Sequence, residues 1–167
     1  MVTQIRDPGL CYASVRVVPH YVAVGQQRDL TVQLQGQPGG VTIGVLPVEH
    51  HNHSSADLRL PGHSLSALSI GCCWYTVCDG GGGRFYYGGK ERSAPVGFGS
   101  GDEVSAVVDR HTHSGNGNGN GMVRFLRNGK ALMSETERPL PIGFPEEAVF
   151  VVSFIWEGRS ARIVRFE

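Results

Sequence analysis

Short runs of β-branched and aromatic residues recur along the chain, and Gly- or Pro-rich turns separate them. In the clearest run, DLTVQLQ, the apolar residues Leu30, Val32 and Leu34 alternate with polar ones. An alternation with period two is typical of a strand that buries one face. About ten such runs occur, with turn sequences such as QPGG, DGGGG and GFGSGD between them. The pattern predicts an all-β fold, namely a two-sheet antiparallel β-sandwich with little or no helix.

The length favours a single domain. The chain has 167 residues, which is the size of one ordinary domain, and its 24 Gly and 9 Pro fit many turns. The low-complexity stretches at 80–83 and 115–121 do not separate regions of different composition. We therefore expect one domain over residues 1–167, with its core at about 30–166 and short frayed ends. A weak helical turn is predicted only near 54–60.

The charge balance argues against two classes of partner. Lys plus Arg and Asp plus Glu both number 15, and no basic block occurs. Nucleic acids and anionic membranes select basic surfaces, so neither is an expected partner. The longest apolar runs are shorter than the roughly 20 residues of a membrane-spanning helix. The first residues do not resemble a signal peptide. We expect an intracellular location, in the cytoplasm or the nucleus.

The cysteines and histidines do not form a metal-binding pattern. Three of the four cysteines, Cys72, Cys73 and Cys78, lie in one stretch, which is unlike a disulfide framework and predicts free thiols. Neighbouring strand residues point to opposite faces, so Cys72 and Cys73 are poorly placed to share an ion. The paired Cys and His spacing of zinc sites is missing. We predict no metal and no cofactor.

Catalytic motifs are also missing from the sequence. Cys78, beside Asp79 and a glycine run, is the candidate nucleophile of a thiol enzyme. It lacks the strand–glycine–helix setting that activates such a group. The glycine run lacks the Lys-Ser/Thr of a phosphate-binding loop. A Cys-dependent enzyme is therefore the weakest alternative, and we predict a chain that is not an enzyme.

One segment has a specific arrangement, VGFGSGDEVSAVVDRH followed after a loop by MVRFLRNGKAL. A Gly-rich turn with Asp102 leads into a buried strand, and a second strand runs into Asn128-Gly129, the strongest short turn signal. This resembles the signature of the SPRY domain. VTIGVLP, LSIGCCWYTVCDGGGGRFYYGG and FPEEAVFVVSFIWEGRSARIVRF resemble further segments of that family in the same order. The resemblance covers about residues 30–166.

The resemblance implies a non-catalytic protein–protein interaction module. SPRY domains bind proteins or short peptides, some as adaptors or as the substrate-recognition element of a ubiquitin ligase. In members that carry a SOCS box, a Trp-Gly after a Val-Val-Ser strand lines the peptide pocket. Trp156 and Gly158 match it with Glu157 inserted between them, and the alternative is that Trp156 is a core residue. The other candidate partner-binding residues are Tyr75, Tyr86, Arg84 and Arg59.

The main alternative reading of the function concerns the kind of ligand. Two-sheet sandwiches also bind carbohydrate, so a lectin-like function is the main alternative to protein binding. We expect a monomeric domain that belongs to a larger protein or complex.

The repeat HTHSGNGNGNG at 111–121 lies between two strands that are predicted to pair. We expect it to be the mobile tip of one hairpin and dispensable for folding, because lengthening a loop costs little closure entropy.

Overall fold

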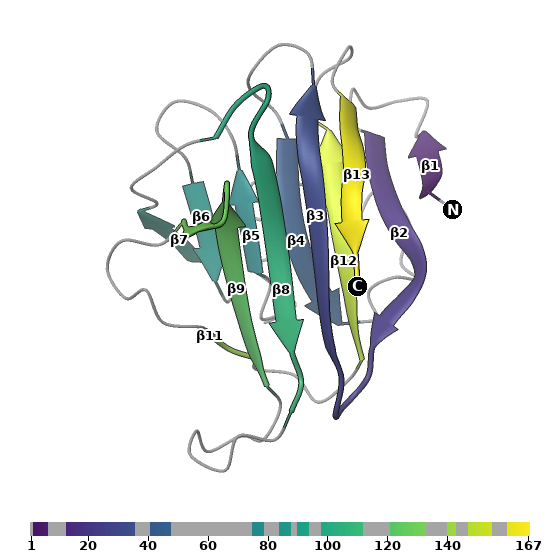
Figure 1. Cartoon of the computed structure of the whole chain (residues 1–167), viewed down its shortest axis with the longest axis vertical. Coiled ribbons are helices and arrows are strands. Elements are labelled where there is room, and N and C mark those ends of the chain that lie inside the picture. Colours follow the sequence, from purple (N-terminus) through teal and green to yellow (C-terminus); the bar gives the residue numbers. More distant parts are fainter. Residues whose placement is uncertain are drawn as a thin grey trace.

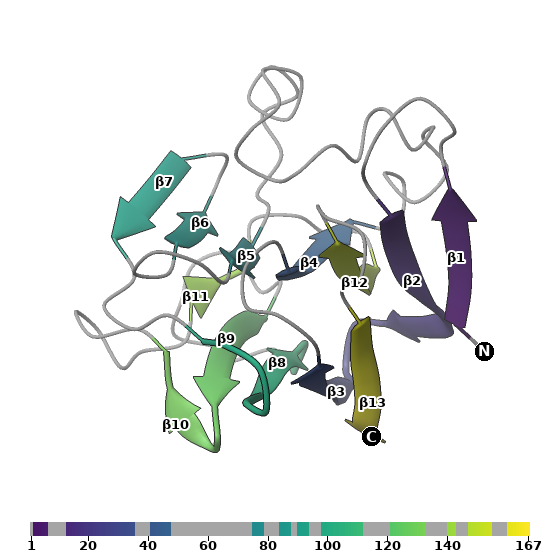
Figure 2. The same cartoon turned by 90° about the horizontal axis from the view of Figure 1, so that it is seen from above.

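The computed structural model contains two antiparallel β-sheets packed face to face (Figure 1). It describes residues 2–6, 13–35, 41–47, 75–78, 84–87, 90–93, 98–111, 121–132, 140–142, 147–154 and 160–167. These ranges contain strands and turns but no helix, which confirms the all-β prediction. In particular, no helix among them is long and apolar enough to cross a membrane. Figure 2 shows the two sheets from above as separate layers.

The first sheet has seven strands in the order β1-β2-β12-β4-β5-β6-β7. Every neighbouring pair is antiparallel. Strand β12 lies in the interior of the sheet, where it pairs with β2 on one side and β4 on the other. The strands are β1 (Val2–Arg6), β2 (Ala13–Val22), β4 (Val41–Pro47), β5 (Tyr75–Cys78), β6 (Arg84–Tyr87), β7 (Lys90–Ser93) and β12 (Ala148–Phe154).

The second sheet has six strands. Five follow the order β10-β9-β8-β3-β13, and β11 pairs with β9 off this path. The strands are β3 (Gln27–Gln35), β8 (Glu103–Asp109), β9 (Met122–Arg127), β10 (Lys130–Ala131), β11 (Leu140–Pro141) and β13 (Ser160–Phe166).

The core lies between the two sheets. The alternation of DLTVQLQ holds, since Leu30, Val32 and Leu34 are all buried in the core cluster. The facing sheet contributes Ile43, Val45 and Phe150 from β4 and β12, among others. The ring of Phe150 packs edge-on against that of Phe166 in β13, with centroids 5.9 Å apart and planes at 87°. This aromatic pair joins an interior strand of one sheet to the edge strand of the other.

The N-terminal strands differ from the sequence prediction. The apolar runs SVRVV and YVAV, with Pro19 between them, favour two separate strands, but SVRVV and the first half of YVAV belong to the single strand β2, which continues through Pro19. The register of β2 with β12 is interrupted between Arg16 and Tyr21, so Pro19 has no Cα partner in that ladder. Proline is tolerated there because its missing N–H would have no ladder bond to make.

Both ends of the chain are paired with neighbouring strands, although frayed ends were expected. The five residues of β1 pair with β2. Val22, well before residue 30, is completely buried in the core. At the other end, Glu167 exchanges two backbone hydrogen bonds with Asp29, at 2.8 and 3.1 Å. The predicted helical turn near 54–60 lies outside the described residues.

Strands β8 and β9 form a hairpin, and Asp109 is the Cα partner of Met122. Residues 110–121 therefore connect two adjacent strands. Arg110, which is completely buried, ties the start of this connection to the β2–β3 turn: its N–H donates to Gln26 O at 2.8 Å, and its carbonyl accepts from Gly25 N at 3.0 Å. Residues 112–120 lie outside the described residues, so their mobility stays a prediction.

Candidate functional site

One end of the sandwich brings together strand ends from both sheets. It is the upper end in Figure 1, where β3, β9 and β12 finish and β4, β8 and β13 begin. The sheet registers agree with this view, because Ser160 at the start of β13 pairs with Gln35 at the end of β3. Likewise, Phe154 at the end of β12 pairs with Val41 at the start of β4.

The carboxylate of Asp102 organises this end. Its Oδ2 accepts hydrogen bonds from the Gly99 N–H at 2.8 Å and from Arg127 Nε at 2.9 Å, and its Oδ1 accepts one from Asn128 Nδ2 at 2.8 Å. Burial alone would raise the pKa of Asp102. The hydrogen bonds from Gly99, Asn128 and Arg127, together with the charge of Arg127, outweigh burial and lower that pKa. Asp102 is therefore held as the ionised carboxylate.

Asn128 is held at both ends of its side-chain amide. While Nδ2 donates to Asp102, Oδ1 accepts a hydrogen bond from the Glu103 N–H at 2.9 Å, and the Asn128 N–H donates to Glu103 O at 2.8 Å. The backbone φ is 48° at Asn128 and 77° at Gly129, which confirms the predicted Asn-Gly turn. We call Asp102, Asn128, Arg127, Gly99 and Glu103 the Asp102 lock.

The lock also fixes the end of a third strand. The carbonyl of Asp102 accepts from Leu34 N at 3.0 Å, and Gly101 N donates to Leu34 O at 2.9 Å. Strands β3, β8 and β9 are thus tied together at one point. The Gly-Asp and Asn-Gly elements, which resemble a family signature in the sequence, form a structural joint here.

Three of the predicted partner-binding residues, Trp156, Gly158 and Arg59, lie outside the described residues. Trp156 and Gly158 fall between Phe154, the last residue of β12, and Ser160, the first of β13. Both of these flanking residues are at the end of the sandwich that carries the lock. The chain segment that holds Trp156 therefore starts and finishes at this end.

The register places Arg84 at the same end. Arg84 pairs with Cys78, Cys78 with Thr42, and Thr42 with Ser153. These four residues form one row across β6, β5, β4 and β12. Three strand spacings of about 4.8 Å separate Arg84 from Ser153, or about 14 Å in all. Arg84 is therefore within reach of a partner that also contacts the segment after Phe154.

The two candidate tyrosines take different positions in the sheet. Tyr75 pairs with Val45, a core residue, whereas Tyr86 pairs with Thr76, which in turn pairs with Gly44. Residues in one row share a face and neighbours along a strand alternate. Tyr75 thus occupies a core-side position, and Tyr86 occupies an outer position. Arg84, two residues before Tyr86, has the same outer position.

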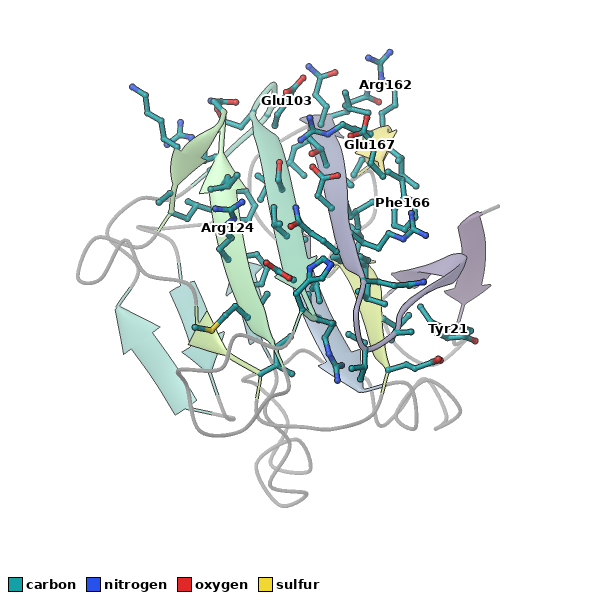
Figure 3. The ribbon with its side chains drawn as sticks, turned by 60° about the horizontal axis from the view of Figure 1, so that its bottom comes forward. Tyr21, Glu103, Arg124, Arg162, Phe166 and Glu167 are labelled. Atoms are coloured by element: carbon teal, nitrogen blue, oxygen red, sulfur yellow. The ribbon has the colours of Figure 1, made fainter. Side chains whose placement is uncertain are left out.

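Exposed arginines on the six-stranded sheet were not among the predicted residues. Arg124 lies between the core residues Val123 and Phe125, and Arg162 lies on β13; both are exposed (Figure 3). Arg165, also on β13, forms an ion pair with Asp29, with 2.5 Å between Nη2 and Oδ2. The alternation in MVRFLR and SARIVRF is the signal that places such residues opposite the core.

The described residues contain no group of three or more His, Cys, Asp or Glu side chains that would hold a metal ion. His111, from the repeat, bonds locally: its Nδ1 lies 2.7 Å from Asp109 Oδ1, and its N–H donates to the same oxygen at 2.9 Å. This pair is exposed and closes the end of β8. Nothing at this position resembles a nucleophile with its base.

Comparisons with known proteins give a result in structure but not in sequence. No protein-family model and no curated protein sequence matches the chain. A human SPRY domain is similar at a TM-score of 0.56 and 15% identity, covering 96% of this chain and 93% of that one. A mutant form of the Emp46p carbohydrate recognition domain is similar at a TM-score of 0.52 and 9% identity, covering 99% and 84%.

The potassium-bound form of the same Emp46p domain is similar at a TM-score of 0.51 and 8% identity, covering 93% of this chain and 76% of that one. At these identities the similarity is one of fold. The SPRY likeness agrees with the resemblance found in the sequence, whose Asp102 and Asn128-Gly129 meet where β8 begins and β9 ends. The chain therefore has a SPRY-like β-sandwich fold.

Proposed function

We propose that this chain is a non-catalytic interaction module, which binds a protein or short peptide at the end of the sandwich that carries the Asp102 lock. The observation that carries the proposal is a convergence. The lock, the start of β6 at Arg84, and both flanks of the segment with Trp156 lie at one end of a SPRY-like fold. Rigid sandwiches commonly use the segments at one end for recognition.

The residue types at this end suit protein recognition. Trp, Tyr and Arg are enriched among the few residues that supply most of the binding free energy of an interface. Trp156 would be the main anchor, with Gly158 shaping the turn after it. Arg84 and Tyr86, in outer positions of β6, would contact the partner beside it. Tyr75, in a core-side position, would support the sheet beneath them.

Within this proposal the chain acts as an adaptor or a substrate-recognition element, as some SPRY domains do in ubiquitin ligases. An intracellular location, in the cytoplasm or the nucleus, belongs to the same proposal. Its motivation is the clustering of three cysteines in residues 72–78.

A peptide selection tests the function. The folded chain would be used to select from a displayed random-peptide library, and the Kd of a selected peptide would then be measured for variants. Trp156→Ala should weaken binding by about 30-fold or more, which corresponds to the 2 kcal/mol typical of an anchor. Arg84→Ala should weaken binding by a smaller factor. Peptides that bind both variants as tightly as the parent chain would contradict the proposal.

Two matched controls separate binding from folding. Val24→Ala removes an apolar side chain that is 58% exposed in the turn at the opposite end of the sandwich. Arg124→Ala removes an exposed arginine from the outer face of the six-stranded sheet. Both should keep the parent affinity. Thermal unfolding of every variant confirms that a loss of affinity does not come from loss of the fold.

Carbohydrate binding is the second candidate function. The observation that favours it is the fold likeness to the Emp46p carbohydrate recognition domain over 99% of the chain. A glycan array with the same variants distinguishes the two. Selective glycan binding without any selectable peptide would replace the protein-interaction proposal.

A further inference from the structure

Asn128 and Gly129 form the dipeptide most suited to spontaneous deamidation. In this reaction the backbone nitrogen of the following residue attacks the side-chain carbonyl carbon of asparagine. Glycine has no side chain to hinder that approach, and its backbone is the most permissive. Both residues are exposed, so water has access to the turn. In the folded chain, the hydrogen bonds of the Asp102 lock oppose this reaction.

Two structural features hold the reaction back. The side-chain amide is restrained at both ends, with Nδ2 on Asp102 at 2.8 Å and Oδ1 on the Glu103 N–H at 2.9 Å. The left-handed backbone, with φ of 48° at Asn128, is the second. With ψ at about +30 to +60° in this region, the Gly129 nitrogen lies far from the Cβ of Asn128. Ring closure therefore requires the turn to open.

We propose that Asn128 is a deamidation site that the Asp102 lock protects, and that its conversion turns the lock from attraction to repulsion. In the reaction, the Gly129 nitrogen forms a bond with Asn128 Cγ and loses its proton, and Nδ2 leaves as ammonia with that proton. Water then opens the five-membered imide at either carbonyl. The products are aspartate, or isoaspartate with an additional backbone carbon.

The product is incompatible with the lock. An aspartate at 128 has no N–H to donate to Asp102 Oδ1, and it brings a second negative charge to a distance now occupied by a 2.8 Å hydrogen bond. Isoaspartate also lengthens the turn between β9 and β10. Either product breaks the side-chain bond that links the end of β9 to the start of β8. The damage is thus a one-way chemical change at the end of the sandwich where the lock lies.

Peptide mapping by mass spectrometry tests the inference. The folded chain is incubated at mildly alkaline pH, and the fraction converted at Asn128 is followed over time, beside the same chain in urea and the Asp102→Ala variant. The folded chain should react roughly 10- to 100-fold more slowly than the denatured one, because the turn must first break two hydrogen bonds. The folded Asp102→Ala variant should react faster at Asn128 than the folded wild type and so reduce this difference.

The chain carries its own reference sites. Asn116, Asn118 and Asn120 are each followed by Gly, so the same digests report their conversion under identical conditions. If Asp102→Ala does not fold, the wild-type rate at Asn128 in low, non-denaturing urea replaces it and should rise with urea concentration. Equal rates at Asn128 in the folded and the denatured chain would overturn the inference, as would a folded Asp102→Ala variant that reacts no faster than wild type.

Discussion

The Asn128 side-chain amide donates a hydrogen bond of 2.8 Å to the Asp102 carboxylate, although 26 positions separate the two residues. The same carboxylate accepts from Gly99 N and Arg127 Nε, so that three donors converge on one small, partly buried anion. Charge-assisted hydrogen bonds of this kind are the strong ones. This one side chain links the start of β8 to the end of β9, while backbone bonds of Gly101 and Asp102 to Leu34 add β3 to the joint.

Asp102→Ala should therefore lower the free energy of unfolding by about 2 to 3 kcal/mol, because it removes hydrogen bonds to a charged group and leaves their donors without it. Urea unfolding at neutral pH measures the change. Glu103→Ala is the matched control, since it removes an exposed carboxylate from the next residue and keeps the backbone groups that bond Asn128. It should change the free energy by no more than about 0.5 kcal/mol. Equal losses for both variants would contradict a special role of Asp102.

The lowered pKa of Asp102 predicts how stability depends on pH. Burial opposes the shift, but the bonds from Gly99, Asn128 and Arg127 exceed it, so the folded-state pKa lies below the ordinary aspartate value of about 3.9. The unfolded chain then binds this proton more readily. The stabilisation is present above about pH 4 and is lost as the pH falls through the lower folded-state pKa.

A comparison with Asp102→Asn isolates this contribution. The difference in free energy of unfolding between wild type and the variant should be constant from pH 7 to about 5 and should shrink below about pH 4. Urea titrations across this range give the difference directly, and contributions from other carboxylates cancel in it. A difference that is the same at every pH would show that Asp102 does not titrate as stated.

Local patterns made much of this arrangement predictable. The alternation around Leu30 and Val32 marked a strand with one buried face, and Asn128-Gly129 marked a turn with positive φ. Both signals depend on residues that are adjacent in the chain. The family resemblance added the order of Asp102 and Asn128, and the structure shows what that order does.

Long-range partners were beyond local reasoning. No pattern shows that Asn128 bonds to Asp102 and Glu103, because many pairings satisfy the same alternation. The continuation of β2 through Pro19 was missed because proline normally argues against a strand, and only the register with β12 reveals that no ladder bond is needed there. The exposure of Trp156 depends on the packing of the segment after β12, for which a single sequence carries no rule.

Gly121, which ends the β8–β9 connection, should be the least replaceable of the described glycines with a positive φ. A Cβ on Gly121 would lie 2.2 Å from the Asp109 carbonyl oxygen, and its φ is +100°. Gly25, in the β2–β3 turn, has a φ of +83° but open space around it. Gly25→Ala should cost only the left-handed penalty of about 1 to 2 kcal/mol.

Gly121→Ala adds a collision with backbone to the same penalty. It should therefore lower the melting temperature by more than Gly25→Ala does, or prevent folding altogether. Thermal unfolding followed by circular dichroism compares the two. Similar melting temperatures for both variants would mean that the close approach of Gly121 to Asp109 is not maintained in solution.

A cross-strand hydrogen bond stabilises the outer side of the six-stranded sheet. Thr31 and Ser105 are Cα partners on β3 and β8, and their hydroxyl oxygens lie 2.8 Å apart. Both residues are buried, at 3% and 6% exposure, although their neighbours Leu30 and Val104 are the ones that face the core. Each hydroxyl therefore needs the other as its partner.

A double-mutant cycle measures this dependence. Thr31→Val and Ser105→Ala should each lower the free energy of unfolding by about 1 to 2 kcal/mol, because each removes one hydroxyl and leaves the other, buried hydroxyl without its hydrogen-bond partner. The free energy lost in the double variant should be smaller than the sum of the two single losses, by a coupling energy of about 1 kcal/mol. Ser105→Ala combined with Val24→Ala, in the distant β2–β3 turn, should be additive within about 0.5 kcal/mol. If Thr31 and Ser105 were additive to the same degree, the two hydroxyls would be bonding to water instead of to each other.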